Sequence, residues 1–588
     1  MPHLFLFTEI LKRWAVKYLY VKNQIMTVEL FDSYGYDSKG GNFICNAVRK
    51  GLKYEPETRV SIKRNALYTF LIESGQETND INQSPLLYEK NEKKQPKHDY
   101  SKDYLTFEAL ENAEFTLTIG SEVSTERLTS ISYSLDNGET WVDTNNEDNQ
   151  TITITTPEVI AGSKVLWKGV GVATTSSSYI QNIASADRVK NVSIFTSTGY
   201  YIASGNIMSL LYGDNFEDKD YFESGSSYNF SLLFYAYNIL NGNKLIDANK
   251  LILPAKICTE GCYHRMFQSQ INMSVGPEIL AKEAAPYCCY AMFIQCTSLT
   301  TAPKLLMTTL SDSCYYAMFQ LCASLVKAPK LPVTTLANSC YYGMFMNCTS
   351  LIKAPELPAT TLSDSCYYAM FSNTSLVEAP KLPATTLAEY CYTRMFQDCT
   401  SLVTAPELPA TTLSTACYEL MFMSCSLLIN VPKSLPATTL ANTCYHGMFY
   451  SCTSLEQGPT VLPGETMKPW CYESMFEECH SLKIAPKIYA KISANRCFNY
   501  MFMNCTSLEE GPDIFLSTLS QLSCKNMFTG CSSLKYIKCL ATDISAENCT
   551  RSWVKGVAAN GTFVKNASMS SWTTGDDGIP SGWGVENA

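Results

Sequence analysis

The 588-residue sequence has few of the residues on which most catalytic sites depend. Its five histidines are scattered along the chain: His3, His98, His264, His446 and His480. This scatter gives little support to a Ser–His–acid or metal-hydrolase site. The sequence also lacks a glycine-rich phosphate loop and a Cys-x-x-Cys pair of the kind that binds zinc. We therefore expect no enzyme activity, no cofactor and no metal site.

An excess of positive charge and long apolar runs are also missing. The chain carries 45 Lys and Arg against 55 Asp and Glu, a formal charge of −10, which argues against nucleic acid as the main partner. No apolar run reaches the roughly 18 residues that a membrane-spanning helix needs. Residues 1–26 show no cleavable secretory signal, so we predict an amphipathic helix there, with Met26 as an alternative start.

Changes in composition divide the chain into several parts, as its length suggests. We predict a region of unclear fold at 1–87, a polar linker at 88–103 and a small all-β sandwich-like domain at 104–198. An N-cap with a degenerate repeat follows at 199–250, and regular repeats at 251–534. Residues 535–588 are predicted to form a degenerate last repeat and a C-terminal cap, because the end coils of solenoids are usually atypical.

The sandwich prediction rests on short alternating segments at 115–119, 131–133, 151–155 and 164–167. Between two of them, Ser134-x-Asp136-x-Gly138-x-x-Trp141 matches the Asp-box, a hairpin turn that resembles those of sialidase propellers. Such propellers carry several copies, and a single copy predicts a structural turn. The acidic stretch 214–220 predicts a solvated loop, with calcium binding as the alternative.

The repeats are marked by Met-Phe, which occurs eleven times between Met266 and Phe528 at steps of 25 to 27 residues. This period predicts a leucine-rich α/β solenoid of about 12 coils. Thr309 precedes Asp312 as in a capping box, so each coil is expected to hold a short helical turn and one strand, stacked about 4.8 Å apart. Charges that alternate after each Ala-Pro are expected to face each other between coils. The predicted inward side chains include Phe293, Phe319, Phe345, Phe371, Phe396, Phe422, Phe449, Phe476 and Phe502.

The cysteines, 25 in all, follow the repeat in two ladders. The first ladder lies five residues before each Phe, and the second lies three residues after it and includes Cys296, Cys322, Cys348 and Cys399. Disulfides and a chain of metal sites are the alternatives to buried free thiols. We favour free thiols, because Cys262 and Cys366 lack a second-ladder partner in coils that keep the rest of the motif.

The pattern Met-Phe-x-x-Cys-x-Ser-Leu resembles the BspA-like leucine-rich repeat family, in a variant with Met-Phe in place of Ala-Phe. It is nearly complete at 292–299, 344–351, 395–402, 448–455 and 501–508, within a resemblance that covers about residues 230–550. Members of that family are mainly bacterial surface proteins that adhere to host proteins, cells or matrices. The resemblance therefore implies an adhesive scaffold, although it does not identify a ligand.

One variable position, three residues before each repeat Phe, stands out as a candidate binding surface. It reads His264, Tyr290, Tyr316, Tyr342, Tyr368, Thr393, Glu419, His446, Glu473 and Asn499. Four successive tyrosines could form a platform for a glycan or peptide, because tyrosine combines a rigid ring with a polar tip. The alternative is that they only cover the coil edge.

From these features we predict a non-enzymatic adhesion protein that binds a host protein or glycan, with candidate ligand contacts at Tyr290, Tyr316, Tyr342, Tyr368, His264 and His446. The expected location is extracellular, at a bacterial cell surface or on a phage particle. No nucleic-acid partner and no membrane span are expected, and the oligomeric state stays open. The alternative function is a structural spacer or a phage tail-associated assembly component.

Overall fold

The fold comes from a computed structural model of the chain, which forms two compact units, 1–99 and 100–588. It describes residues 98–119, 130–145, 152–170, 193–223, 226–236, 244–570 and 572–588, and upstream of these only the strands of the first unit. Those strands form an antiparallel sheet in sequence order: β1 (Tyr18–Val21), β2 (Gln24–Tyr36), β3 (Asn42–Arg49), β4 (Arg59–Lys63) and β5 (Ile72–Glu73). The helix predicted for residues 1–26 is therefore wrong from Tyr18 onward, and residues 1–17 lie outside the described part.

The second unit begins with the predicted sandwich, in which the strands at 115–119 and 164–170 alternate fully buried with less buried side chains. The smaller sheet has the order β10-β7-β12, and the larger sheet β15-β14-β13-β6-β11-β8-β9. Rings from both sheets meet between them, with Phe107 and Phe195 edge-to-face at 4.9 Å. The strands are β6 (Leu105–Ala109), β7 (Phe115–Ile119), β8 (Ser130–Ser134), β9 (Val142–Asn145), β10 (Ile152–Thr155), β11 (Lys164–Val170), β12 (Ser193–Ser197) and β13 (Tyr201–Asn206).

The Asp-box turn has the predicted geometry. Asp136 accepts hydrogen bonds from the backbone and hydroxyl of Thr140, which hold the pKa of Asp136 down at about 2. Gly138 has φ +92°, and Trp141 packs edge-on against Tyr104 at 5.0 Å. The motif therefore shapes a hairpin turn between β8 and β9.

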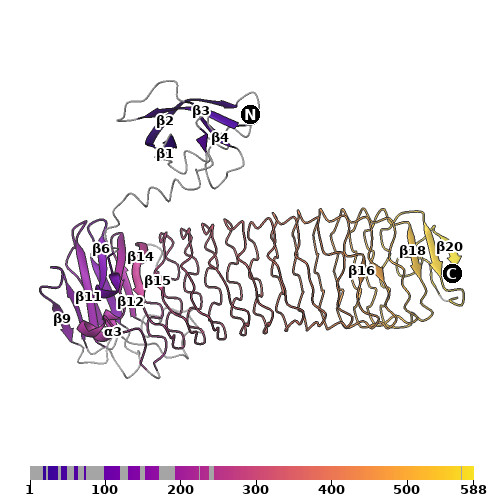
Figure 1. Cartoon of the computed structure of the whole chain (residues 1–588). Coiled ribbons are helices and arrows are strands. Elements are labelled where there is room, and N and C mark those ends of the chain that lie inside the picture. The colour runs from indigo at the N-terminus through magenta and orange to yellow at the C-terminus, as the bar shows by residue number, and fades with distance from the viewer. Residues whose placement is uncertain are drawn as a thin grey trace. The chain divides into compact units, whose positions relative to one another are not determined.

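The larger sheet of the sandwich continues directly into the solenoid (Figure 1). After β13 the chain forms a short α3 (Ser209–Tyr212) and then β14 (Leu245–Leu253), which pairs in parallel with β13 and with β15 (Glu278–Ile279). In the degenerate repeat, Leu233-Phe234 stands in the place of Met-Phe, and the Phe234 ring stacks on Phe267 at 5.2 Å. The sandwich thus covers the first edge of the solenoid.

The solenoid has about 13 turns with little helix. Two ladders of parallel bridges join the coils, such as Val275↔Thr301↔Lys327 and Thr386↔Thr412↔Thr439. Longer pairings occur at the N-terminal end, between β14 and β15, and toward the C-terminal end. The latter are β16 (Val461–Leu462) with β17 (Lys487–Ile488), and β18 (Tyr536–Cys539), β19 (Thr562–Lys565) and β20 (Gly584–Asn587). The proline-rich strands therefore make isolated bridges rather than a continuous sheet.

The predicted helical turn in each coil is instead a run of consecutive turns. Alternate amides donate within the coil to the carbonyl three residues earlier, as Met318 does to Tyr315. The amides between them donate to the next coil, as Phe319 does to Met344. In a helix, the amides would form their hydrogen bonds within one coil. Here every second amide forms its hydrogen bond to the neighbouring coil and so links the two coils. We call this segment of each coil the turn segment.

The turn segments place residues in left-handed backbone geometry at every fourth position. In one coil these residues are Ser313, Ala317 and Leu321, with φ of 54°, 50° and 64°. The position of Ala317 is filled by Gly343 in the next coil, at φ 56°. Residues with a Cβ atom are strained there by about 1–2 kcal/mol each. Packing of the buried side chains between coils, described below, keeps these residues in the strained geometry.

We predict that Ala317→Gly stabilises the protein by about 0.5–1 kcal/mol, because relief of the left-handed strain exceeds the entropy that glycine adds to the unfolded chain. The measurement is the urea midpoint of unfolding. Ala359→Gly is the control, since Ala359 is buried and has no positive φ. That control should be destabilising, and equal effects of the two variants would contradict the strain argument.

The solenoid core consists of side-chain columns that run from coil to coil. The predicted phenylalanines are all fully buried and stack face to face, as Phe319 and Phe345 do at 5.7 Å and 5°. A second buried column includes Tyr315, Tyr341 and Tyr367. Of the charges predicted to pair after the proline of each coil, only Asp513 has an ion pair within the described part, with Lys538. Packing rather than that charge ladder sets the register.

The predicted cysteine ladders are free and fully buried thiols in the described coils. Each second-ladder thiol donates to the carbonyl of a repeat phenylalanine in the preceding coil, as Cys348 does to Phe319 at 3.0 Å. Gln270 makes the equivalent bond in the first regular coil, from its Nε2 to the carbonyl of Phe234 at 2.6 Å. The ladder is thus a row of hydrogen-bond donors between coils, in addition to being a row of small apolar side chains.

Aromatic rings cover the C-terminal end of the solenoid core. Trp553 replaces the repeat methionine, stacks on Trp572 at 5.5 Å and donates from Nε1 to the carbonyl of Gly578 at 2.8 Å. Trp583 lies over the last coil and donates to the carbonyl of Ala558. These tryptophans cover the last core layer.

Candidate functional site

The variable positions of the turn segments form a column on one face of the solenoid. From Tyr290 to Tyr368 the half-buried rings stack at 4.6, 4.4 and 4.4 Å between centroids, within 9° of parallel. We call Tyr290, Tyr316, Tyr342 and Tyr368 the tyrosine column. The next residue in each coil is small there: Ala291, Ala317, Gly343 and Ala369. Small neighbours leave room for the large rings.

The N-terminal end of the column is closed. His264 stacks on Tyr290 at 5.0 Å and is contacted edge-on by Tyr228. Arg265 lies over the same Tyr290 ring at 5.6 Å. Burial, and secondarily the charge of Arg265, lowers the pKa of His264 far below its usual value, so this histidine is neutral. His264 acts as the first ring of the stack.

Stacking determines what the column can offer a ligand. The ring faces within the column lie against each other, so the edges and the hydroxyl groups are what a partner can reach. Burial raises the pKa of Tyr316, with further contributions from Tyr342 and Tyr290, so the Tyr316 hydroxyl stays protonated at neutral pH. The column is therefore a line of neutral donors and acceptors rather than an open aromatic platform.

The positions one and two residues after each repeat phenylalanine carry no charged side chain in the four coils of the column. They hold Ile294, Gln295, Gln320, Leu321, Met346, Asn347, Ser372 and Asn373. The amides also form links between coils, as Asn373 does by donating to Asn347 at 2.7 Å. Charges lie elsewhere on the same turn segments, at the exposed Asp312 and Asp364. The hydroxyls of the column and the amides beside it are groups that suit a polar ligand.

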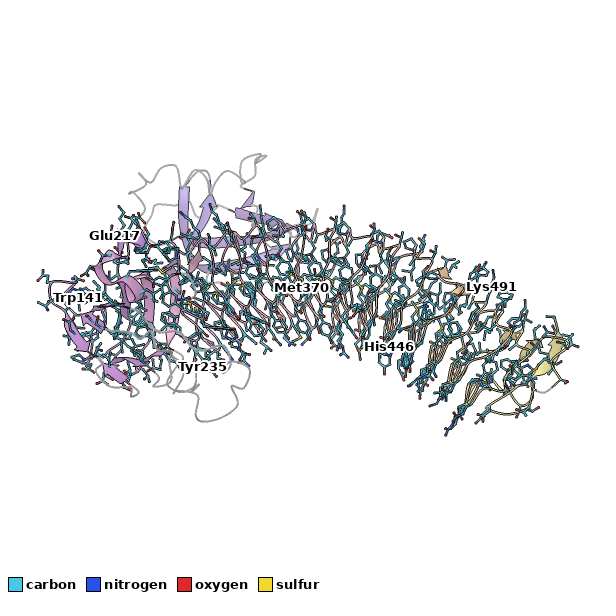
Figure 2. All side chains as sticks on the ribbon, turned by 90° about the horizontal axis from the view of Figure 1, so that it is seen from below. Trp141, Glu217, Tyr235, Met370, His446 and Lys491 are labelled. Atoms are coloured by element: carbon cyan, nitrogen blue, oxygen red, sulfur yellow. The ribbon has the colours of Figure 1, made fainter. Side chains whose placement is uncertain are left out.

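Further along the stack the same positions become charged. His446 lies beyond Met370 (Figure 2) and is separated from the tyrosine column by Thr393 and Glu419. Its Nδ1 is 3.1 Å from Glu419 Oε1. Buried Glu473 accepts from Arg496 and Asn499 at 2.8 Å each. The structure therefore joins His264 to the tyrosines, whereas His446 belongs to a separate ladder of polar pairs.

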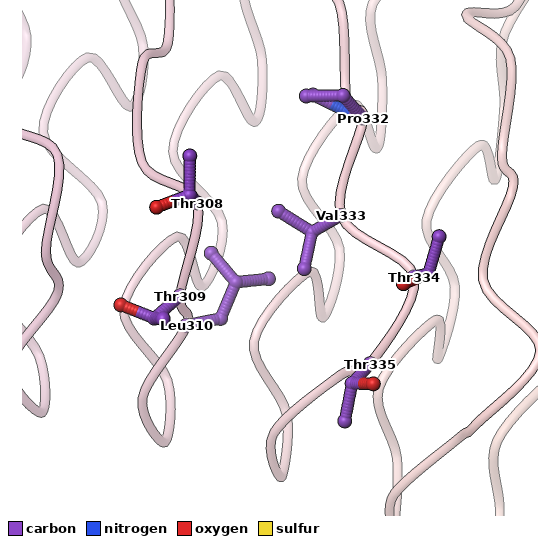
Figure 3. A pocket seen from close by; sticks show the side chains of 7 residues that line it. All are labelled: Thr308, Thr309, Leu310, Pro332, Val333, Thr334 and Thr335. Carbon is purple, nitrogen blue, oxygen red and sulfur yellow. The ribbon is translucent and has the colours of Figure 1, made fainter.

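Two further surface features were not anticipated from the sequence. Val326, Ile352, Val377 and Ile429 occupy the position after each Thr-Ser-Leu type leucine and are 37–51% exposed, which makes an apolar stripe. The sequence contains a signal for this stripe, because the position holds a β-branched residue in each coil from Thr300 to Ile429. A second feature is an open hollow of about 500 Å³ between two coils, lined by Thr308, Thr309, Leu310, Pro332, Val333, Thr334 and Thr335 (Figure 3). Hydroxyl and apolar groups line it, with no ionisable group.

Within the described ranges, no group of three or more His, Cys, Asp or Glu side chains is arranged to hold a metal ion. Asp214 of the acidic loop instead accepts hydrogen bonds from Tyr104 at 2.7 Å and Lys168 at 2.9 Å. Among the same residues, no helix has both the length and the apolar character needed to cross a membrane.

Comparison with known proteins gives little beyond the architecture. No protein-family model and no curated protein matches the chain. A solved structure of a leucine-rich repeat protein from Eubacterium ventriosum ATCC 27560 is similar, at 13% identity and a TM-score of 0.34, over 65% of this chain and 96% of that one. This likeness is too low to carry an argument about function. The stacked coils themselves define the class as a repeat solenoid, an architecture whose extended surface serves for binding.

Proposed function

We propose that this protein is a non-enzymatic adhesion protein that binds a glycan or a protein of a host through the turn face of its solenoid. The observation that carries the proposal is the tyrosine column, four hydroxyl-bearing rings stacked in successive coils. Repeats of this length do not need four exposed tyrosine edges for folding, because other coils have Thr393, Glu419 or Asn499 at that position.

Of the two ligand types, a glycan suits the column better. Hydroxyl and amide groups spaced regularly along the stack can exchange hydrogen bonds with a chain of similar sugar units. The resemblance to BspA-like surface adhesins supports an adhesive role, at a bacterial surface or on a phage particle. Binding spread over several coils also suits attachment, since many weak contacts sum along an extended surface.

A structural spacer is the second candidate, and one observation favours it. Strand pairing runs without interruption from β9 in the sandwich to β15 in the solenoid. A continuous sheet holds the two parts in a fixed relation, as a spacer between other components would require. In this case the solenoid surface would bind no ligand of its own.

The test is a glycan and host-protein array probed with the full chain and with Tyr316→Ala/Tyr342→Ala. We expect selective binding by the natural chain and a loss of about 2 kcal/mol or more in the variant, roughly 30-fold in affinity. Tyr489→Ala is the matched control, because Tyr489 is an exposed tyrosine outside the column. Circular dichroism checks folding. A folded sample that binds nothing on the array would favour the spacer.

A further inference from the structure

The hollow between two coils of the solenoid lies where one ladder of parallel bridges is interrupted (Figure 3). A bridge joins Thr335 to Thr361 in the following coil. Among the bridges of the described residues, none joins Thr309 to Thr335, although both pairs have the same spacing in the sequence. The same ladder also lacks a bridge between Thr361 and Thr386, where the coil is shorter. At the hollow, the ladder therefore opens between two coils of ordinary length.

This interruption leaves backbone groups unused at the hollow. In the bridged coils, the amide of Thr361 donates to the carbonyl of Thr334 at 3.3 Å, and the amide of Leu336 donates to the carbonyl of Thr361 at 3.1 Å. The equivalent amides at the hollow are those of Thr335 and Leu310, and neither donates to a backbone carbonyl of the described residues. These two donors are therefore available to water or to a ligand.

The lining of the hollow combines apolar and hydroxyl groups. The Leu310 and Val333 side chains point toward one another from the two coils (Figure 3), and Pro332 adds a third apolar group. The remaining lining residues are exposed threonines, Thr308, Thr309, Thr334 and Thr335. Each threonine hydroxyl can both donate and accept a hydrogen bond. No lining residue is ionisable, so the lining offers no partner for a charged ligand.

We propose that this hollow binds one sugar unit of a neutral glycan. Such a unit has hydroxyls for the threonines and the unused amides, and C–H groups on its ring faces for Leu310, Pro332 and Val333. The hollow measures about 500 Å³, within the range of roughly 300–1,000 Å³ that is usual for ligand pockets. The inference goes beyond the proposed function, because none of the lining residues belongs to the tyrosine column.

An extended peptide suits the hollow less well. A peptide strand that joins a sheet forms a row of backbone hydrogen bonds, whereas the two coils remain bonded to each other on either side of the opening. Before it, the amide of Val326 donates to the carbonyl of Thr300 at 3.2 Å, and after it, the amide of Ser313 donates to the carbonyl of Asn338 at 2.9 Å. The short opening therefore favours a single unit of a chain over a strand.

The test titrates the full chain with two neutral sugars, cellotetraose and maltotetraose, and follows binding by ligand-observed NMR. We expect binding of at least one of them. Thr334→Val/Thr335→Val removes two hydroxyls at exposed positions and should weaken this binding about tenfold. The matched control is Thr438→Val/Thr439→Val, which changes the same Thr-Thr-Leu-Ala-Asn sequence in a coil where Thr439 is bridged to Thr412. The control should bind like the natural chain, and an equal loss in both variants would overturn the inference.

The other outcomes separate this inference from the proposed function. Sugar binding that Tyr316→Ala/Tyr342→Ala abolishes and Thr334→Val/Thr335→Val leaves unchanged would overturn the hollow as the site and keep the tyrosine column. Tighter binding of tetragalacturonate or of a tetra-alanine peptide, lost in Thr334→Val/Thr335→Val, would overturn the assignment to a neutral sugar. If neither tetraose binds to the folded natural chain, this inference fails, while the array decides the proposed function separately.

Discussion

Raising the pH above about 9 is expected to unfold the solenoid cooperatively. Burial raises the pKa of the ladder thiols, to about 12 for Cys348, Cys479 and Cys531. In the unfolded chain a thiol titrates near 8.5. The folded state thus keeps protons that the unfolded state loses, so stability is complete below about pH 8.5 and falls as the pH rises toward the folded value.

The loss of stability at high pH is large because the repeat places many such thiols in the core. Each such thiol removes about 1.4 kcal/mol of stability per pH unit between its two pKa values. Burial also raises the pKa of Tyr341 and Tyr367, which adds to the loss at still higher pH. A few thiols therefore suffice to cancel a stability that is usually about 5–15 kcal/mol.

The measurement is urea unfolding, under reducing conditions, at a series of pH values between about 7 and 10. In Cys348→Ala/Cys479→Ala, the slope of the unfolding free energy against pH should be shallower by about 2.8 kcal/mol per pH unit than in the natural chain. Equal slopes would contradict the assignment of the alkaline transition to the buried thiols, whatever the stability of the variant at neutral pH.

Phe345→Ala is expected to destabilise the protein by about 3–5 kcal/mol and to break the solenoid into two independently melting parts. Phe345 is fully buried and stacks on Phe319 at 5.7 Å and on Phe371 at 5.7 Å. Coils contact only their neighbours, so a cavity in the middle of the stack weakens the coupling between the coils on either side.

Calorimetry checks this expectation, because the natural chain should melt with stronger coupling between its coils than the variant. Phe515→Ala is the control, since Phe515 is 42% exposed and lies outside the phenylalanine column. It should leave the shape of the transition unchanged. A single, uniformly shifted transition in Phe345→Ala would mean that the coupling extends beyond neighbouring coils.

Much of the fold was predictable because every coil has to bury the same side chains at the same positions. Phe345 and Cys348 recur with the period, and a residue that recurs in this way must meet its own copies in the stack. The strand at β7 was likewise readable from strict alternation. The predicted helical turn failed, because a capping-box pattern such as Thr309 with Asp312 does not reveal that alternate amides bond to the next coil.

The candidate site was predictable only in part. The sequence singled out Tyr290 to Tyr368 as one column, and the rings do lie together. It could not show that the ring faces are used by the stack itself, nor that His446 pairs with Glu419. The end of the column was visible as the change from Tyr368 to Thr393.

The sequence by itself determined that this protein is a solenoid and which residues fill its interior, because periodic apolar residues have to be buried against each other. Only the tertiary structure decided how the coils are held together and which groups face a partner. Hydrogen bonds between coils, such as that from Cys348 to the carbonyl of Phe319, join residues that are 29 positions apart. The local sequence pattern around one residue does not identify such a distant partner.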